Sequence, residues 1–188
     1  MEKFIYEYRN SMPEILCDEI IDFYENSEGK YQGSTLGGVQ KNIKDTLDFI
    51  IPKNDKKWSK IENFLYKELQ RNIKRYIKYI NKNNYKPELN NNFDSTLFKN
   101  TELHTDSFMV QKYFKNKGKY VYHDDFTVEY SEKRYRVITF LWYLNSIEEG
   151  GQTEFWGDFR IKPEKGKLLL FPACWSFPHR GIMPISDN

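Results

Sequence analysis

The sequence is poor in cysteine, and its charges almost cancel. Two cysteines in 188 residues cannot build a disulfide framework, so we expect a reducing compartment. Lys and Arg exceed Asp and Glu by 29 − 27 = +2, which argues against a nucleic-acid-binding protein. No apolar run approaches the roughly 20 residues of a membrane span, and residues 1–10 lack the apolar stretch of a signal peptide. These absences predict a soluble, cytoplasmic protein that binds neither nucleic acid nor membrane.

Aromatic residues, in contrast, are abundant. They make up 17% of the chain, which is too many for a disordered protein, so we expect a packed core. A length of 188 residues suits a single domain. Within it, we expect residues 1–95 to form mainly helical support and residues 96–188 to form a β core. The oligomeric state is not determined by the sequence.

Two helices are predicted in the first half of the chain. Ser11 and Glu14 stand three residues apart as in a capping box, and Leu16 and Ile20 follow at helical spacing. An apolar stripe predicts a second helix from Asp55 to Asn81. The opposite face of this helix is basic, and we interpret it as a solvated surface rather than a phosphate-binding one because the net charge is small.

The second half contains short segments that are rich in aromatic, β-branched or aliphatic residues. These segments are Phe108–Phe114, Lys119–Asp125, Arg136–Asn145, Gln152–Phe155 and Lys167–Pro172. Because no long helical pattern separates them, we expect antiparallel strands in a sandwich or barrel. Helices followed by strands predict an α+β chain with a β core.

The chain has three histidines, and His123 begins a His-x-Asp pattern with Asp125. Residues i and i+2 of a strand share one face, so these two side chains can converge. His179 follows the apolar run at 168–172, which places it on a late strand or just after one. Two histidines and one carboxylate on one face, with the opposite positions open, are typical of non-haem Fe(II) oxygenases.

Further motifs surround these residues in a regular order. They are Gln111-Lys112-Tyr113, Gly118, Tyr120, Arg136–Asn145, Glu149–Phe155, Lys162–Gly166, Leu168–Pro172 and Pro178–Gly181. From about Val110 to Ser186, their order and spacing resemble the prolyl 4-hydroxylase-like branch of the 2-oxoglutarate/Fe(II)-dependent dioxygenases. The resemblance implies a double-stranded β-helix, a relative of the jelly roll, with N-terminal supporting helices.

The resemblance also implies the site residues. The iron ligands would be His123, Asp125 and His179. Tyr113 would bind the distal carboxylate of 2-oxoglutarate, while Thr139 and Tyr143 would line the co-substrate pocket or simply pack in the core. A second His-x-Asp pattern, His104-Thr105-Asp106, does not match the family motif, so we do not expect it to bind the metal.

The implied activity is oxidative decarboxylation of 2-oxoglutarate coupled to hydroxylation. The cofactors would be Fe(II), the co-substrates 2-oxoglutarate and O₂, with ascorbate as a candidate addition. The substrate would be a prolyl residue in a peptide, another side chain or a small molecule. Two alternatives stay open: a non-catalytic β-sandwich binding module with a vestigial or structural metal site, and a zinc hydrolase, which would also need a nearby general base.

One element of the family pattern is missing. A Lys or Arg for the distal carboxylate usually stands nine or ten residues after the second histidine, and 179 + 9 gives Asn188. Arg180 should point to the opposite face of its strand from His179. We therefore expect the chain to be C-terminally truncated and to lack the last core strand. The alternative is that another cation, such as Arg136, takes this role.

Overall fold

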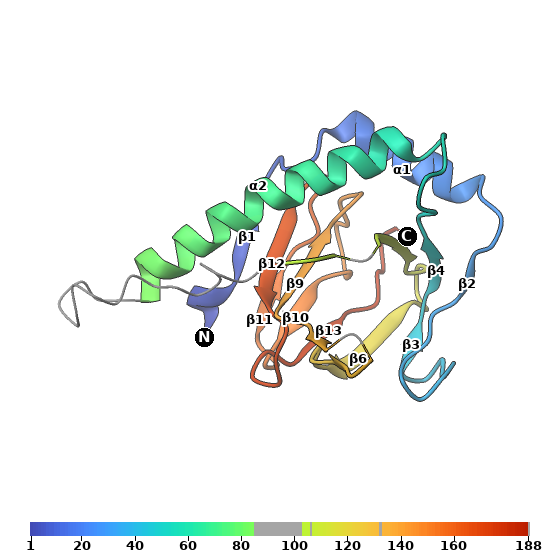
Figure 1. Ribbon diagram of the computed structural model, residues 1–188. Helices are drawn as coiled ribbons and strands as arrows, with labels where there is room; N and C mark the ends of the chain where they lie inside the picture. Colours follow the sequence, from blue (N-terminus) through green and yellow to red (C-terminus); the bar gives the residue numbers. More distant parts are fainter. Residues whose placement is uncertain (85–102, 106, 132, 188) are drawn as a thin grey trace.

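The computed structural model describes residues 1–84, 103–105, 107–131 and 133–187, and Figure 1 shows their arrangement. The predicted division at residue 95 and the residues Asp106 and Asn188 lie outside this part. The helices are η1 (Glu2–Phe4), α1 (Glu14–Glu25) and α2 (Ser59–Asn84). The strands are β1 (Tyr6–Tyr8), β2 (Tyr31–Gln32), β3 (Lys44–Asp45), β4 (Leu47–Ile50), β5 (Met109–Lys112), β6 (Lys119–His123), β7 (Val128–Glu129), β8 (Arg134–Tyr135), β9 (Ile138–Trp142), β10 (Thr153–Phe155), β11 (Phe159–Ile161), β12 (Leu168–Pro172) and β13 (His179–Gly181).

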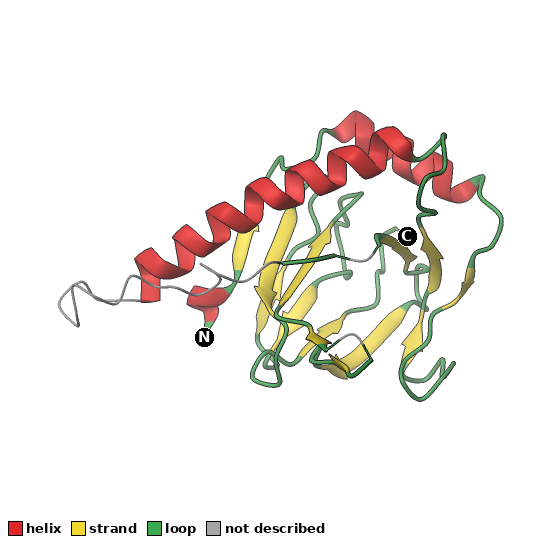
Figure 2. Ribbon diagram, in the orientation of Figure 1, coloured by secondary structure: helices red, strands yellow, loops and turns green. Residues whose placement is uncertain are grey.

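The strands form four antiparallel sheets (Figure 2). The largest has the order β11-β10-β13-β6-β3, and a second sheet has the order β1-β12-β9. A third sheet, β2-β4-β5, stands beside them, and β7 pairs only with β8 among the described strands. The prediction of an antiparallel β core is therefore confirmed.

Strand β12 lies at the centre of the hydrophobic core. Its residues 168–171 are all buried, which explains why its sequence is a continuous apolar run instead of an alternating one. Leu168 and Leu170 pack with the residues of the two helices, whereas Leu169 and Phe171 pack with Phe155 of the largest sheet. The sheet β1-β12-β9 is thus a middle layer between the helices and the largest sheet.

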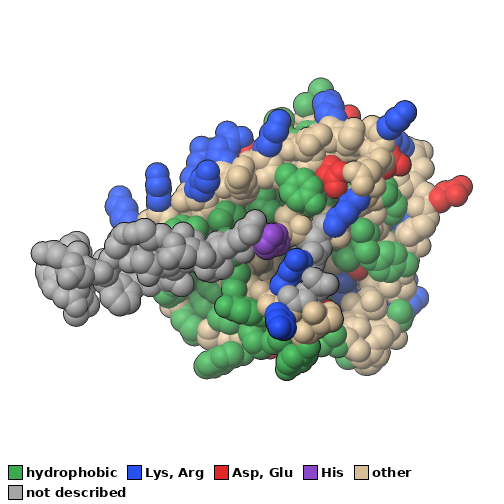
Figure 3. Space-filling model, viewed as in Figure 1, with side chains coloured by type: hydrophobic (Ala, Val, Ile, Leu, Met, Phe, Trp, Pro, Cys, Tyr) green, Lys and Arg blue, Asp and Glu red, His purple; other side chains and the backbone are tan. Residues whose placement is uncertain are grey.

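Both long helices cover the same side of the sheets (Figure 1). The second helix matches its predicted position, although it begins at Ser59 and not at Asp55. Its exposed face carries a row of Lys and Arg side chains (Figure 3). Among the described residues, no helix combines the length and the apolar character that a membrane span requires.

The predicted capping box at the start of α1 is wrong. Pro13 occupies the N-cap position, and no side chain caps the helix. Ser11 instead donates a hydrogen bond to the buried Glu68 Oε1 at 3.0 Å and accepts one from Trp142 Nε1 at 3.0 Å. A hydroxyl has one proton to donate, so this contact between α2 and β9 takes the place of the local cap.

Candidate metal centre

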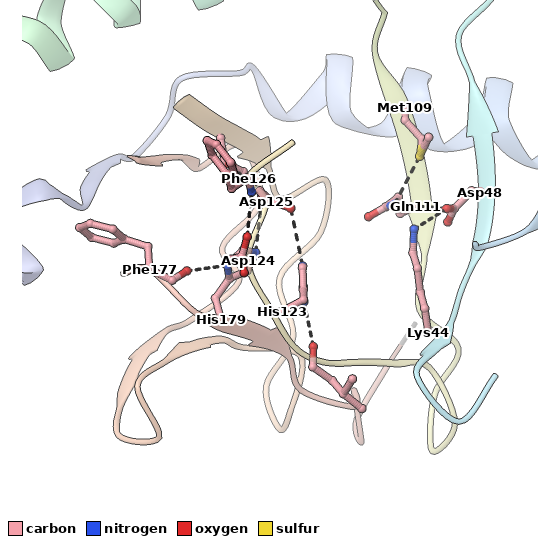
Figure 4. A network of polar contacts seen from close by, with 12 residues as sticks. Lys44, Asp48, Met109, Gln111, His123, Asp124, Asp125, Phe126, Phe177 and His179 are labelled. Carbon is pink, nitrogen blue, oxygen red and sulfur yellow. Dashed lines mark hydrogen bonds and ion pairs between the residues drawn. The ribbon is translucent and has the colours of Figure 1, made fainter. Parts of the chain in front are cut away.

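Two neighbouring strands carry the three predicted ligands. His123 ends β6 and His179 begins β13, and the two residues are direct partners in the antiparallel register. Asp125 follows two residues after the end of β6. The ligand atoms of His123, Asp125 and His179 all lie within 4.8 Å of one another, and Figure 4 shows the side chains gathered at one point. The sequence therefore predicted the convergence correctly, although β6 is shorter than expected.

The two imidazoles present the same nitrogen to the carboxylate. His123 Nδ1 lies 2.8 Å from the Val121 carbonyl oxygen, and His179 Nδ1 lies 3.1 Å from that of Phe177. A carbonyl only accepts, so each contact requires a proton on Nδ1 and leaves Nε2 of the neutral ring with its lone pair. The Nε2 atoms lie 3.7 Å and 3.5 Å from the oxygens of Asp125. This donor set fits a mononuclear iron site.

The electrostatics of the cluster favour a neutral imidazole. Burial, together with the neighbouring His179, lowers the pKa of His123 to about 4. At neutral pH the ring is therefore unprotonated at Nε2, which is the form that binds a metal. The cluster needs no proton release from this residue to accept a cation.

Thr139 lies beside the metal cluster. Its hydroxyl donates a hydrogen bond to Asp125 Oδ2 at 2.8 Å. This contact fixes one oxygen of the carboxylate, in the way that outer residues commonly orient metal ligands. Thr139 does not belong to the lining of the neighbouring cavity, in contrast to Tyr113 and Tyr143.

A cavity of about 680 Å³ extends from the largest sheet towards the helices. Its polar lining includes Tyr113, Tyr143 and Thr153, and a hydrogen bond of 2.7 Å joins the hydroxyls of Tyr143 and Thr153. Gly181, two residues after His179, allows Tyr113 to approach, because a Cβ atom there would lie 2.9 Å from Tyr113 Cε1. The cavity thus reaches the strand that carries one of the metal ligands.

The cavity offers no free cation in the part of the chain that the structure describes. Lys112 is the single basic residue of its lining, and its ammonium group is paired with Glu25 Oε1 at 2.6 Å. Arg136 is exposed to solvent. Arg136, the cation that the sequence offered as an alternative, is not part of the lining, and neither is Arg180.

Arg180 points to the other face of its strand, as its position predicts. It donates to the buried Glu154 Oε1 at 2.6 Å, and Arg160 donates to Oε2 at 2.5 Å. Burial raises the pKa of Glu154, but hydrogen bonds from Tyr122, Arg160 and Arg180 outweigh it and hold that pKa below its ordinary value. Arg180 therefore compensates the buried carboxylate of Glu154 on the largest sheet.

Two residues near the site were not assigned a role from the sequence. The ring of Tyr120 stacks on that of His123, with centroids 3.5 Å apart, and Lys44 lies over the ring of Tyr120. Tyr120 is one of the residues that carry the family resemblance, so its position three residues before His123 could have indicated a role near the site. Lys44 has no such local signal. His104 is exposed and is not part of the metal cluster.

Comparison with family models now tests the resemblance. Residues 108–186 match the model of the 2OG-Fe(II) oxygenase superfamily. The match covers the same part of the chain as the motifs and includes all three candidate ligands. A search of the curated proteins found no match.

Solved structures of prolyl hydroxylases share the fold. A viral collagen prolyl hydroxylase from Paramecium bursaria Chlorella virus-1 is 15% identical, with a TM-score of 0.62 over 98% of this chain and 90% of its own. A prolyl-4-hydroxylase from Pseudomonas putida is 17% identical, with a TM-score of 0.62 over 97% and 87%. A Trichoplax adhaerens prolyl hydroxylase in complex with a hypoxia-inducible factor peptide is 18% identical, with a TM-score of 0.64 over 98% and 79%. The fold is consistent with the jelly roll of the 2OG oxygenases.

Proposed function

We propose that the chain is an Fe(II)- and 2-oxoglutarate-dependent hydroxylase in which His123, Asp125 and His179 bind the iron. The convergence of these three side chains within 4.8 Å, in a segment that matches the model of the 2OG-Fe(II) oxygenase superfamily, carries the proposal. Bound iron would supply the activation of O₂, with 2-oxoglutarate as the electron donor. Val121, Phe177 and Thr139 orient the three side chains through their hydrogen bonds.

We assign the co-substrate to the cavity beside the metal centre. Burial raises the pKa of Tyr113 and of Tyr143, so both phenols keep their protons at neutral pH. A protonated hydroxyl donates a hydrogen bond to a carboxylate, and such charge-assisted bonds are the stronger ones. Tyr113 and Tyr143 therefore suit the distal carboxylate of 2-oxoglutarate.

The finer fold that we propose is a double-stranded β-helix with room for one more strand. Strands β5 and β9 are each at the edge of a described sheet, and both line the same cavity. An extended segment between them would join the sheets β2-β4-β5 and β1-β12-β9, and a basic residue on it would face the co-substrate. This supports a missing core strand over a role for Arg136.

A lengthened chain tests this assignment. A β-strand segment added after Asn188, with Lys as its first residue, is expected to bind 2-oxoglutarate at least about tenfold more tightly, since a buried carboxylate gains a partner. The matched control carries Gln in place of that Lys and should give only the contribution of the strand. Equal dissociation constants by calorimetry for all three chains would contradict the missing strand.

The substrate that we favour is a residue in a peptide. The segment between Asp125 and Thr139 forms the two-stranded sheet β7-β8 next to the metal centre. It exposes Phe126 (48%), Tyr130 (85%) and Tyr135 (63%), and such side chains can hold an extended peptide. The Trichoplax relative was solved with a peptide, which supports the same class of substrate here.

Spectroscopy and product analysis test the activity. Anaerobic addition of Fe(II) and 2-oxoglutarate should give a weak visible charge-transfer band, and O₂ should then yield succinate. Mass spectrometry on candidate peptides and amino acids should detect a gain of one oxygen atom. His179→Ala should abolish the band, whereas His104→Ala, which changes an exposed histidine outside the cluster, should keep it.

A non-catalytic binding module is the second candidate. It is favoured by one observation, the paired state of Lys112, the single basic residue among the described lining residues. Absence of both the band and succinate, even in the lengthened chain, would support it. Metal binding without any turnover is the result that this alternative predicts.

A further inference from the structure

Two side chains from neighbouring strands stack behind His123. The ring of Tyr120 lies parallel to the imidazole, with centroids 3.5 Å apart and planes 15° apart. The ammonium group of Lys44 lies 5.3 Å from the centroid of Tyr120, and the two residues are register partners on β3 and β6. The stack therefore runs from the edge of the largest sheet to the metal centre.

Lys44 is a buried charge that is held firmly in place. It is 5% exposed, and its Nζ lies 2.7 Å from Asp48 Oδ2. Gln111 Nε2 donates to the same oxygen at 3.2 Å, as Figure 4 shows. A buried ammonium group is costly unless it is paired, and a cation over an aromatic ring is worth more when it is desolvated. The pair with Asp48 fixes the cation above the ring of Tyr120.

His123 needs more than its backbone contact to be oriented. The contact of Nδ1 with Val121 fixes one atom of the ring, but it does not by itself fix the ring plane. His179 is tilted by 54° to this ring and belongs to the metal cluster itself. The flat contact with Tyr120 is the one that defines the plane.

We propose that Lys44 and Tyr120 are positioning residues for His123. Lys44, anchored by Asp48, holds the ring of Tyr120, and this ring sets the imidazole plane so that Nε2 points to the metal. The proposal rests on the proposed function, because it takes His123 to be an iron ligand. It assigns to the Lys44–Asp48 pair a role in the active site, although Asp48 precedes His123 by 123 − 48 = 75 positions in the sequence.

The first test uses the metal-free protein. A ring stacked on His123 shifts its carbon-bound protons upfield in an NMR spectrum, and a chain with three histidines allows assignment by single His→Gln variants. Tyr120→Leu should remove this shift, and Tyr120→Phe should keep it. The double variant Lys44→Met/Asp48→Asn, which removes the pair without leaving a lone charge, should reduce it. Unchanged His123 signals in Tyr120→Leu would overturn the stack.

The second test measures Co(II) affinity by calorimetry. Tyr120→Leu should weaken binding about tenfold, the double variant about threefold, and Tyr120→Phe less than about twofold, because outer residues typically change metal affinity by 10- to 100-fold. Thermal unfolding checks that each variant is folded. If Tyr120→Leu does not fold, the double variant takes its place in the test. Equal affinity in a folded Tyr120→Leu or, failing that, a folded double variant would overturn the positioning role.

A matched control separates this role from a general effect of cation–aromatic contacts. Lys57 lies 4.4 Å from the ring centroid of Phe23, next to the helices, and Lys57→Met should change neither the His123 signals nor the Co(II) affinity. A parent chain that binds no Co(II) would contradict the proposed function instead. The metal-free spectra would then still decide whether the stack orients His123.

Discussion

The candidate metal centre and the cavity next to it differ in how they are held together. His123 and His179 lie on paired strands, and Val121, Phe177 and Thr139 fix the orientation of the metal cluster. The cavity, in contrast, lies between β5 and β9, two strands that are edges of their described sheets. The metal end is organised by short-range contacts, whereas the cavity end depends on two sheets that no described strand joins to each other.

This difference implies that the two ends can be perturbed separately. Backbone carbonyls orient the two histidines, and Thr139 orients Asp125, so metal affinity should respond to these three candidate ligands and to the few side chains that touch them. Co-substrate affinity should respond to Tyr113, Tyr143 and the lining of the cavity. Substitutions that affect both ends equally would argue against this separation.

The largest effect is expected at the carboxylate of the metal cluster. Asp125→Ala should weaken Co(II) binding by more than about 100-fold, because one of three ligands is lost and outer residues alone change affinity 10- to 100-fold. Asp124→Ala is the matched control, since the Asp124 carboxylate accepts a hydrogen bond from the Phe126 amide and is not part of the cluster. Calorimetry measures both, and equal losses in the two variants would contradict the ligand assignment.

A substitution at Gly181 should separate the two ends. Its Cβ atom would lie 2.9 Å from Tyr113 Cε1 and 3.1 Å from the hydroxyl oxygen, so the Tyr113 side chain must move. Gly181→Ala should weaken 2-oxoglutarate binding 10- to 100-fold, the range expected when a hydrogen bond to a charged group is lost. In both Gly181→Ala and Tyr113→Phe, the affinity for Co(II) should stay within about twofold of that of the parent chain. A parallel loss of metal binding would show that the ends are coupled.

A smaller effect is expected at Thr139, which the resemblance assigned to the co-substrate pocket. Its hydroxyl contacts Asp125 Oδ2, so Thr139→Val should weaken Co(II) binding about tenfold. The affinity for 2-oxoglutarate, measured with metal bound, should change less. If Thr139→Val weakened 2-oxoglutarate binding more than Co(II) binding, Thr139 would be assigned to the co-substrate cavity instead. Thr139→Ser, which keeps the hydroxyl, is the matched control.

The convergence of His123, Asp125 and His179 was predictable, because local sequence signals determine most of it. The spacing of two residues keeps His123 and Asp125 close together, although β6 ends at His123 and strand alternation does not extend to Asp125. The apolar run before His179 predicts a buried strand nearby. The surrounding motifs then select this His-x-Asp pattern over the one at His104. Helix α2 was equally predictable, since a regular apolar stripe along a long segment is a strong signal.

The remaining features depend on contacts between distant segments. Ser11 leaves its predicted cap for Glu68 and Trp142, and Lys44 reaches the site through a strand of two residues. Strands this short have no periodicity to detect, so β1, β2, β3 and β4 were not predicted from the sequence. Tertiary hydrogen bonds and sheet register decide these positions.

The smallest effect is expected at Arg136, the cation that the sequence offered as an alternative. Arg136 is exposed and does not line the cavity, and an exposed charge contributes little to binding a buried carboxylate. Arg136→Met should therefore change the dissociation constant of 2-oxoglutarate by less than about twofold. The measurement is calorimetry at low and at moderate salt, with Arg9→Met, at a distant exposed ion pair with Glu164, as the control. If Arg136→Met, but not Arg9→Met, weakened 2-oxoglutarate binding tenfold or more, Arg136 would be the partner of the distal carboxylate. The cavity end would then need no further strand.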